Sequence, residues 1–399
     1  MPDNPSVAFL CGVKAGAGGL GVQSANAIAA LALRGGSLQV FGSGFTSGWP
    51  LPERASSIRW NESPSFVSNF AAQYTSLRWR HGDLQFERDA ALGAWAAALI
   101  ERQRPELCYV FTQVGLETLR WARRAGIPTI LENPNGHIRN FRAVYDHESL
   151  VWCGKKYQGH PNQAMIERVE EEYSLADRIR VSSEWSKASM VEGGVPADKI
   201  HVLQQPLNLS RFRPGSRETK HTGPLRVCFV GSLDLRKGFV YLLRAIRMVA
   251  NKNAKLTIVG ATGDRCCASL LKRERAGLDV TVAPGDPVPA YTDSELFVLP
   301  TLEDGSPFSA AEAMASGLPV VVTGSCGAAE WVREGNTGWI IPPRSVEALA
   351  EAIETALKKR EQLGAMGRAA RIDTESRAGS HCIKAVAHWV YDRRLSELQ

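Results

Sequence analysis

The sequence predicts an α/β protein with two doubly wound, Rossmann-like domains, and two observations carry this prediction. Short apolar runs typical of buried parallel strands alternate with helix-like segments in both halves of the chain. A polar stretch at 208–224, with prolines, glycines and charges, interrupts this alternation and is the best linker candidate. At 399 residues the chain is long enough for two domains that each bury a core. We therefore expect domains at 1–207 and 225–381, with a last helix at about 382–399 that completes the first domain.

The composition is that of a globular protein, with 44% hydrophobic and 22% charged residues. A net charge of +6 is far from the dense basic surface of a nucleic-acid-binding protein, so we expect no nucleic acid as a partner. No apolar run approaches the ~20 residues of a membrane span. The N-terminus also lacks the pattern of a signal peptide, so we expect a cytoplasmic protein. The eight cysteines are scattered without a CxxC pair, which predicts reduced thiols and no metal site.

The first half opens with an apolar run at 7–13, a glycine-rich turn at 16–21 and a helix from Val22 to Leu33. This order suits a phosphate, because a helix N-terminus presents free N–H groups. The turn has the spacing GxGxxG, which a dinucleotide site would follow with an acid after the next strand. No Asp or Glu occurs between Asp3 and Glu53, so we do not expect NAD. A tight turn that simply requires glycine is the alternative to a ligand-binding role.

The rest of the first half supplies an aromatic segment and further strands. The segment from Trp49 to Trp95 is rich in aromatic residues and arginines. It predicts either the core of an irregular insertion, which we favour, or a surface for a lipid-linked or aromatic acceptor. Strands are expected at 107–111 and 128–132, with a helix between them. The second of these strands leads to His137, at the sheet edge where open α/β sheets bind ligands. A histidine on a surface loop is the equal alternative.

The second half begins with a strand at 226–231, a loop and a helix from Phe239 to Ala250. Arg236 and Lys237 stand together in the loop. Lysine offers a point charge and arginine a fork of donors, so this pair suits a diphosphate. Two solvated cations at a helix start are the alternative.

The segment from Leu296 to Pro319 predicts a buried strand, a turn and a helix, with Ser306 as the N-cap and Pro307 as the first helical residue. Asp304 precedes this helix. Glu312 lies within it on an apolar face, where a buried carboxylate requires hydrogen-bond partners. Sugar hydroxyls or a protein donor would both serve, and a capping or ion-pairing role for Glu312 is the alternative. The free N–H groups at the helix start suit an anion.

An acid at 304, Glu312 eight positions later, and Ala-Met-Ala-Ser-Gly-Leu-Pro after it together resemble the signature of glycosyltransferase family 4. The resemblance implies the GT-B fold, in which two Rossmann-like domains face each other across a cleft. It also implies a retaining reaction, a nucleotide-diphosphate sugar as co-substrate, and no required cofactor or metal. It places Glu312 on the ribose, Asp304 beside the donor sugar and Lys237 on the diphosphate. We expect Arg236 to substitute there for the arginine that the family has at position 232. The family usually has Glu at position 304 and Arg at position 232, where this chain has Asp304 and Ser232.

The resemblance also implies a wider site. His137 would face the donor sugar and act in catalysis with Asp304, Lys237 and Arg236. The remaining donor-binding residues would contribute through their backbone or their place in the family motifs. They are Gly18, Gly19, Gly21, Gly231, Ser232, Gly305, Ser306, Phe308 and Ser309, together with Glu312.

The prediction is therefore a retaining hexosyltransferase that uses a UDP-sugar, with GDP-mannose as the next choice. Its acceptor hydroxyl would belong to a glycan, a lipid-linked sugar or a small molecule. Peripheral contact with the inner face of a membrane stays open. One alternative is a glycoside hydrolase that uses Asp304 and Glu312 as its carboxylate pair. The other is a non-catalytic subunit that keeps the fold.

Overall fold

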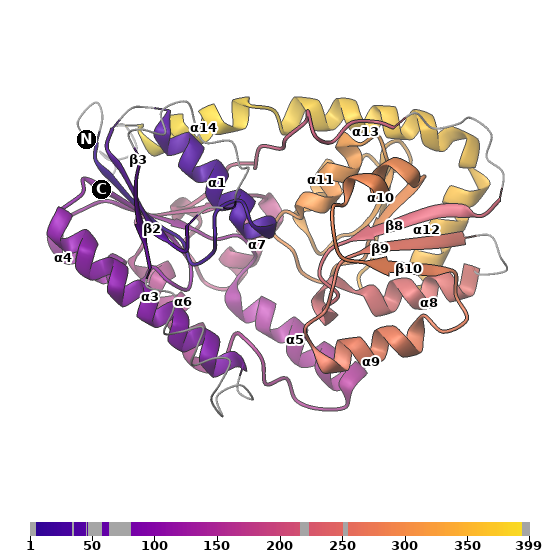
Figure 1. Ribbon diagram of the computed structural model, residues 1–399, viewed down its shortest axis with the longest axis horizontal. Coiled ribbons are helices and arrows are strands. Elements are labelled where there is room, and N and C mark those ends of the chain that lie inside the picture. Colours follow the sequence, from indigo (N-terminus) through magenta and orange to yellow (C-terminus); the bar gives the residue numbers. More distant parts are fainter. Residues whose placement is uncertain are drawn as a thin grey trace.

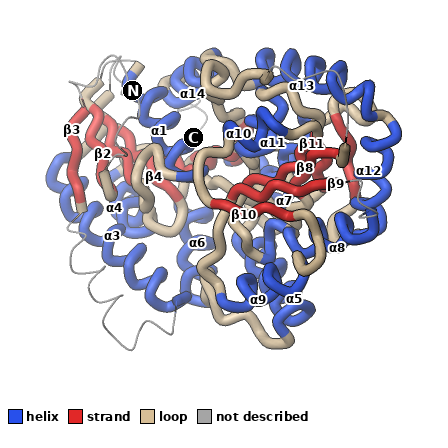
Figure 2. Tube along the Cα trace, turned by 45° about the vertical axis from the view of Figure 1, so that its right-hand side comes forward, coloured by secondary structure: helices blue, strands red, loops and turns tan. Residues whose placement is uncertain are grey.

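The computed structural model places two parallel β-sheets side by side, each covered by helices (Figure 1). Figure 2 shows the strands as two separate groups. The structure describes residues 5–33, 36–44, 46, 58–63, 81–215, 223–249 and 254–392. Three predicted segments lie partly outside these ranges. They are the aromatic segment 49–95, the stretch 208–224 and the last helix at about 382–399. None of the described helices combines the length and apolarity of a membrane span.

Domain 1 contains a seven-stranded sheet in the order β3-β2-β1-β4-β5-β6-β7. All six strand pairs are parallel, as expected for strands joined by crossover helices. The strands are β1 (Val7–Leu10), β2 (Leu38–Gly42), β3 (Ile58–Glu62), β4 (Leu107–Phe111), β5 (Thr129–Glu132), β6 (Arg178–Val181) and β7 (Ile200–Val202). The helices are α1 (Gly18–Ala32), α3 (His81–Gln103), α4 (Leu116–Ala125), α5 (Ile138–Cys153), α6 (Gln163–Leu175) and α7 (Glu184–Glu192).

Domain 2 contains a six-stranded parallel sheet in the order β10-β9-β8-β11-β12-β13. Its strands are β8 (Leu225–Val230), β9 (Ala254–Val259), β10 (Val280–Ala283), β11 (Leu296–Leu299), β12 (Val320–Thr323) and β13 (Gly338–Ile341). Its helices are α8 (Phe239–Val249), α9 (Arg265–Glu274), α10 (Val288–Asp293), α11 (Phe308–Ala315), α12 (Val346–Lys358) and α13 (Leu363–Arg377), with the short 3-10 turns η4 (Leu235–Lys237) and η5 (Gly327–Trp331). Every residue of β11 is buried, which explains its uninterrupted apolar sequence. The predicted pair of doubly wound α/β domains is confirmed.

Two predicted helix starts differ from the structure, the first by four residues and the second by one. Helix α1 begins at Gly18 and not at Val22, so the glycines 18, 19 and 21 form its first turn. Helix α11 begins at Phe308. Pro307 has an extended ψ of 112° and is itself the N-cap, without a side-chain capping bond. Ser306 is therefore outside the helix and does not cap it.

Two helices cross from one domain to the other. Helix α14 (His381–Val390) leaves domain 2 and packs on α1, and the hydroxyl of Tyr391 donates to the carbonyl of Leu31 at 2.9 Å. Helix α5 crosses in the opposite direction and lies beside α9 under domain 2 (Figure 1). Its residue Val144 is buried in the hydrophobic core of domain 2.

The end of α5 is held to domain 2 by several contacts. The ring of Trp152 lies edge-on to Tyr241 at 5.3 Å between centroids. The buried carboxylate of Glu148 accepts from the Tyr241 hydroxyl at 2.8 Å and from Arg344 Nε at 2.7 Å. A disulfide joins Cys153, the last residue of α5, to Cys266 on α9.

The prediction that all cysteines are reduced is therefore wrong for this pair. The two residues are 113 positions apart in the sequence, and only the crossing of α5 brings them together. The other six cysteines are buried free thiols.

Candidate functional site

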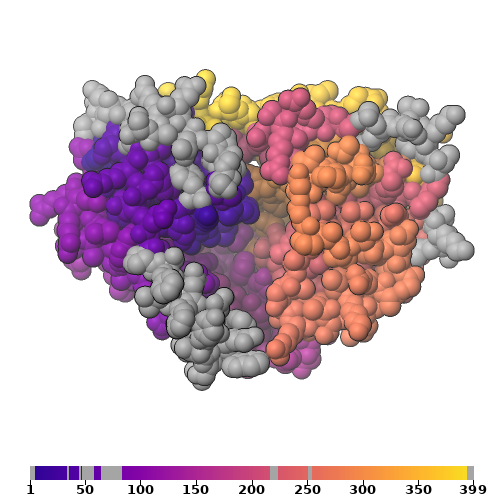
Figure 3. All heavy atoms as spheres, in the orientation of Figure 1, coloured from indigo at the N-terminus to yellow at the C-terminus, as the bar shows by residue number. Residues whose placement is uncertain are grey.

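The candidate site lies in the cleft between the two domains, which the space-filling view shows as a hollow (Figure 3). In domain 2 it is built by two loops that follow neighbouring parallel strands, β8 and β11. The first loop ends in η4, which carries Arg236 and Lys237. The second carries Glu303 and Asp304 and leads into α11. Because carboxyl ends of parallel strands meet at one sheet edge, residues 67 positions apart come together there.

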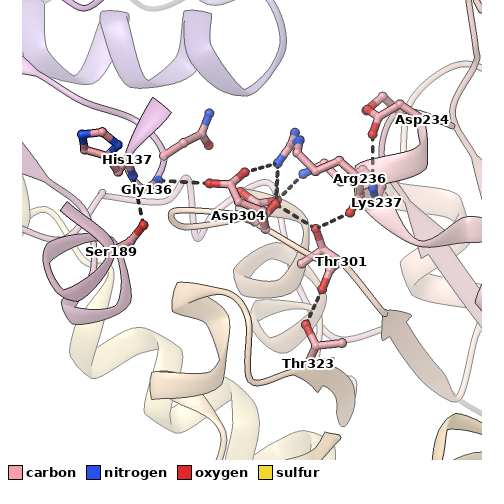
Figure 4. A network of polar contacts seen from close by, with 12 residues as sticks. Gly136, His137, Ser189, Asp234, Arg236, Lys237, Thr301, Asp304 and Thr323 are labelled. Carbon is pink, nitrogen blue, oxygen red and sulfur yellow. Dashed lines mark hydrogen bonds and ion pairs between the residues drawn. The ribbon is translucent and has the colours of Figure 1, made fainter. Parts of the chain in front are cut away.

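Each cation of η4 has an acidic partner (Figure 4). Lys237 Nζ forms an ion pair with Asp304 Oδ2, and their side chains are 14% and 9% exposed. Arg236 NH1 donates to Glu303 Oε2 at 3.1 Å and to the Glu303 carbonyl at 2.6 Å. Asp234 caps η4 by accepting the N–H of Lys237 at 3.1 Å. The structure thus brings Arg236, Lys237 and Asp304 into one cluster, where the charges of the two cations are balanced by Glu303 and Asp304.

The carboxylates around Arg236 keep its guanidinium charged. Burial would lower the pKa of Arg236, but the carboxylates of Asp234 and Glu303 outweigh burial and raise it. The guanidinium also lies 5.0 Å from the ring of Phe141 on α5. Burial raises the pKa of Glu303, and the charge of Arg236 opposes that rise. The arginine is therefore a permanent cation next to Lys237.

Glu303 also connects the two domains. Its Oε1 accepts the N–H of Gly136 from the loop after β5, at 3.0 Å. Next to it, the hydroxyl of Ser183 donates to the Gly305 carbonyl at 2.5 Å. A side chain at Gly305 would not fit, since its Cβ would lie 2.0 Å from the carbonyl oxygen of Pro134. Gly305 therefore allows close contact between the domains at this point.

The start of α11 faces the glycine turn of domain 1. A Cβ placed on Gly19 would lie 3.8 Å from the ring of Phe308, the first residue of α11. Gly18 has φ +62°, a left-handed conformation that favours glycine. A Cβ on Gly21 would lie 2.4 Å from the Lys14 carbonyl. The turn thus presents little more than backbone toward α11, as an anion site requires.

Glu312 is held by a residue that the sequence did not indicate. The Tyr291 hydroxyl donates to Glu312 Oε2 at 2.8 Å and to the Ser309 carbonyl at 3.2 Å. Burial raises the pKa of Glu312, and the bond from Tyr291 opposes this. Tyr291 and Glu303 are the residues of the site that sequence reasoning missed. Tyr291 belongs to no motif, and Glu303 had a signal only in its place beside Asp304.

Some predicted residues lie apart from the cluster. His137 is 3% exposed, and its Nδ1 accepts the N–H of Arg139 at 3.2 Å as the cap of α5. It lies 5.2 Å from the ring of Tyr173 and points away from Asp304 (Figure 4). Burial lowers the pKa of this imidazole. The structure therefore gives His137 a capping position and does not bring its ring to the cations.

Ser232 and Gly231 lie in the loop after β8. The hydroxyl of Ser232 donates to Asp234 Oδ2 at 2.5 Å and so supports the cap of η4. The carbonyl oxygen of Gly231 packs against Gly260, where a Cβ on Gly260 would lie only 1.9 Å from that oxygen. Among the described residues, no group of three or more His, Cys, Asp and Glu side chains could hold a metal ion.

Comparison with protein families gives a match for each domain. Residues 18–205 match the family described as "Glycosyl transferase 4-like domain". Residues 224–359 match the family described as "Glycosyl transferases group 1". The two matches meet near the predicted linker and include the cluster and the glycine turn.

Relatives with names are found among bacterial polysaccharide enzymes. The amylovoran biosynthesis glycosyltransferase AmsK of Erwinia amylovora is 28% identical over 219 residues, which are 51% of this chain and 53% of that protein. The putative colanic acid biosynthesis glycosyltransferase WcaL of Escherichia coli K12 is 27% identical over 189 residues, which are 44% of this chain and 46% of that protein. The chain thus spans about half the length of these curated relatives.

Solved structures match over the whole chain. Sucrose-phosphate synthase from Thermosynechococcus elongatus has a TM-score of 0.76 at 19% identity, covering 98% of this chain and 99% of that one. Alr3699/HepE of Anabaena, solved with UDP-glucose, has a TM-score of 0.70 at 14% identity, covering 97% and 99%. At these identities the likeness is one of fold.

Proposed function

Because this chain belongs to the GT-B glycosyltransferases of the family 4 type, we propose that it moves a hexose from a nucleotide-diphosphate sugar to an acceptor hydroxyl and retains the anomeric configuration. The observation that carries the proposal is the cluster of Arg236 and Lys237 with the two acids of the loop that leads into α11. A diphosphate gains negative charge as the bond to the sugar breaks. Two cations and a helix N-terminus stabilise that charge where it develops.

The acids of the cluster have a part in this exchange. Without a ligand, Asp304 and Glu303 neutralise the two cations. An incoming diphosphate competes with Asp304 for Lys237, which frees the Asp304 carboxylate to accept hydrogen bonds from the donor sugar. Arg236 stays fixed by Glu303 and by Phe141, so it orients the phosphate without moving.

Retention follows from the geometry that we propose for the reacting groups. The acceptor oxygen attacks the anomeric carbon on the face from which the diphosphate departs. The bond from the anomeric carbon to the phosphate oxygen breaks, the bond to the acceptor oxygen forms, and the acceptor proton passes to the departing phosphate oxygen. No protein nucleophile takes part in this route. Lys237 and Arg236 hold the leaving group, and Asp304 orients the sugar.

A UDP-sugar is the donor that we favour, with GDP-mannose next. Support for UDP comes from Alr3699/HepE of Anabaena, a protein of similar fold that was solved in complex with UDP and with UDP-glucose. Glu312 lies one turn into α11 and accepts a hydrogen bond from Tyr291 on α10, and its carboxylate would bind the ribose hydroxyls. The named relatives act in polysaccharide biosynthesis, which favours a glycan acceptor.

The test is a thermal-shift screen with UDP, GDP, ADP and TDP, with and without magnesium. A nucleotide at ~100 times its dissociation constant should add about 2.7 kcal/mol to the free energy of unfolding. We expect the shift with UDP, and we expect Lys237→Ala to lose it. Lys272→Ala, an exposed lysine on α9, is the matched control and should keep the shift. No shift with any nucleotide would contradict the proposal and favour a non-catalytic subunit.

A further inference from the structure

A cavity of about 540 Å³ lies between the two domains, apart from the cation cluster. Helices α5 and α7 of domain 1 form one wall. Residues after β11, β12 and β13 of domain 2 form the other. Among the described residues that line it, none is one that we assigned to the donor site. Small-molecule sites typically have volumes of ~300–1,000 Å³ and favour domain interfaces, so the space is suited to a ligand.

The contact of Glu303 with Gly136 lies between this cavity and Lys237. Ser189 lines the cavity, and its hydroxyl accepts the N–H of His137, next to Gly136, at 3.0 Å. Ser189 and Lys237 lie at opposite ends of the network in Figure 4. Leu302 also lines the cavity, and its N–H donates to the Arg236 carbonyl at 2.8 Å. The cavity therefore backs onto the donor cluster.

The side chains around the cavity match the two kinds of surface on a sugar ring. One face of a pyranose is made of C–H groups, and its rim carries hydroxyls that both donate and accept. Trp185 offers a broad apolar ring and an N–H donor, and its edge lies 3.1 Å from the position of a Cβ on Gly136. Asn140, Ser325 and Glu192 offer an amide, a hydroxyl and a carboxylate.

The charges favour a neutral ligand over an anion. Arg344 is a cation at the cavity, but its Nε donates to the buried carboxylate of Glu148 at 2.7 Å, so its charge is already compensated. Glu192 adds a negative charge. A phosphate or carboxylate ligand would lack the excess positive charge that it needs, whereas a polyol requires only hydrogen-bond partners.

From these observations the structure assigns this cavity to a single neutral saccharide unit, bound apart from the donor sugar. A saccharide there contacts both domains and favours the arrangement in which they are close together. In an enzyme that acts on a glycan, such a site holds a sugar residue of the chain that is not reacting. The inference does not depend on the identity of the nucleotide, because the cavity and the donor cluster have no lining residue in common.

The test is saturation-transfer difference NMR on the full chain with methyl glycosides of glucose, galactose, mannose and N-acetylglucosamine at millimolar concentration. Ala143→Trp fills the cavity from an exposed position on α5 without removing a contact partner. Leu150→Trp lies on the same helix outside the lining and is 64% exposed, so it is the matched control. Asn140→Ala removes one hydrogen-bonding side chain and should weaken binding about fivefold.

We expect transfer to the ring protons of at least one glycoside. The signal should be lost in Ala143→Trp and kept in Leu150→Trp, in Lys237→Ala and with saturating UDP. The inference is overturned if no glycoside gives a signal, or if Ala143→Trp leaves the signal unchanged. It is also overturned if UDP or Lys237→Ala removes the signal, because the sugar would then be in the donor cleft. A failure of the nucleotide screen would leave this readout intact, so the two proposals can fail separately.

Discussion

Neutralising Asp304 should strengthen nucleotide binding even as it weakens transfer. In the unliganded site the Asp304 carboxylate is paired with Lys237. A diphosphate must break that pair before it can use the lysine. Asp304→Asn keeps the size of the side chain and removes the charge. Lys237 is then available to the ligand from the start, while the sugar loses the carboxylate that we propose to orient it.

The magnitude follows from the burial of the pair. At about 4 Å and an effective dielectric constant of about 20, two unit charges attract by about 4 kcal/mol. The side chains are 14% and 9% exposed, so solvent screening is limited but not absent. The diphosphate recovers much of the attraction when it replaces the carboxylate. We therefore expect a net gain of about 1–2 kcal/mol, which is about a five- to thirtyfold lower Kd for UDP.

Isothermal titration calorimetry with UDP measures this effect directly and needs no acceptor. Glu171→Gln, which removes the acid of an exposed ion pair with Arg120 in domain 1, is the charge-matched control and should leave Kd unchanged. Lys237→Ala should bind UDP more weakly than the wild type. If Asp304→Asn binds UDP no better than the wild type, the competition between Asp304 and the diphosphate does not occur, and our account of the cluster is wrong.

Three further outcomes are expected. Arg180→Met leaves the fully buried Glu132 without the cation that lies 3.0 Å away. It should lower the free energy of unfolding, measured by urea denaturation, by about 3–5 kcal/mol, and a loss well below about 1 kcal/mol would contradict this. Tyr291→Phe removes the hydroxyl that donates to Glu312 and should raise the Kd for UDP about fivefold by calorimetry; an unchanged Kd would show that Glu312 does not depend on this bond. Burial raises the pKa of Asp89 from 3.8 to about 6. Between these two pKa values the folded chain holds a proton on Asp89 that the unfolded chain has lost. The free energy of unfolding therefore falls by about 3 kcal/mol as the pH rises from about 4 to about 6. Asp89→Asn should flatten this pH dependence in denaturation midpoints measured below and above the window, and equal slopes in both proteins would refute it.

The central strands of the two sheets could be predicted because they are buried on both faces. A strand such as β11 must then be apolar throughout, and the run from Leu296 to Leu299 shows this without any tertiary information. The meeting of Lys237 with Asp304 was also within reach, since both follow neighbouring parallel strands at one sheet edge. The sequence did not show which carboxylate would take which cation, because Glu303 and Asp304 are adjacent and only the backbone geometry separates them.

Other features could not be predicted from the sequence pattern. His137 was expected at the sheet edge and is there, but its ring turns inward because its Nδ1 caps α5. Tyr291 is an ordinary residue of a short helix until folding brings it to Glu312. The disulfide between Cys153 and Cys266 arises only because α5 leaves its own domain. The bond of Tyr291 to Glu312 and the disulfide are tertiary interactions, and spacing along the chain carries no trace of them. The cap of α5 by His137 is a contact between near neighbours in the sequence, but only the path of the backbone determines that the histidine caps the helix.

The path of α5 bears on how chimaeric enzymes should be built from this chain. A cut in the stretch 208–224 separates the two sheets. It leaves α5 in the first fragment and α14 in the second, although the packing partners of each helix are in the opposite fragment. The first fragment would expose Val144 and Trp152 to water, and the second would leave Tyr241 without the Glu148 carboxylate. A graft of a foreign first domain should therefore keep the native α5 with the second sheet. The native part that is kept, α5 together with the second domain, is then discontinuous in sequence, although it is continuous in space.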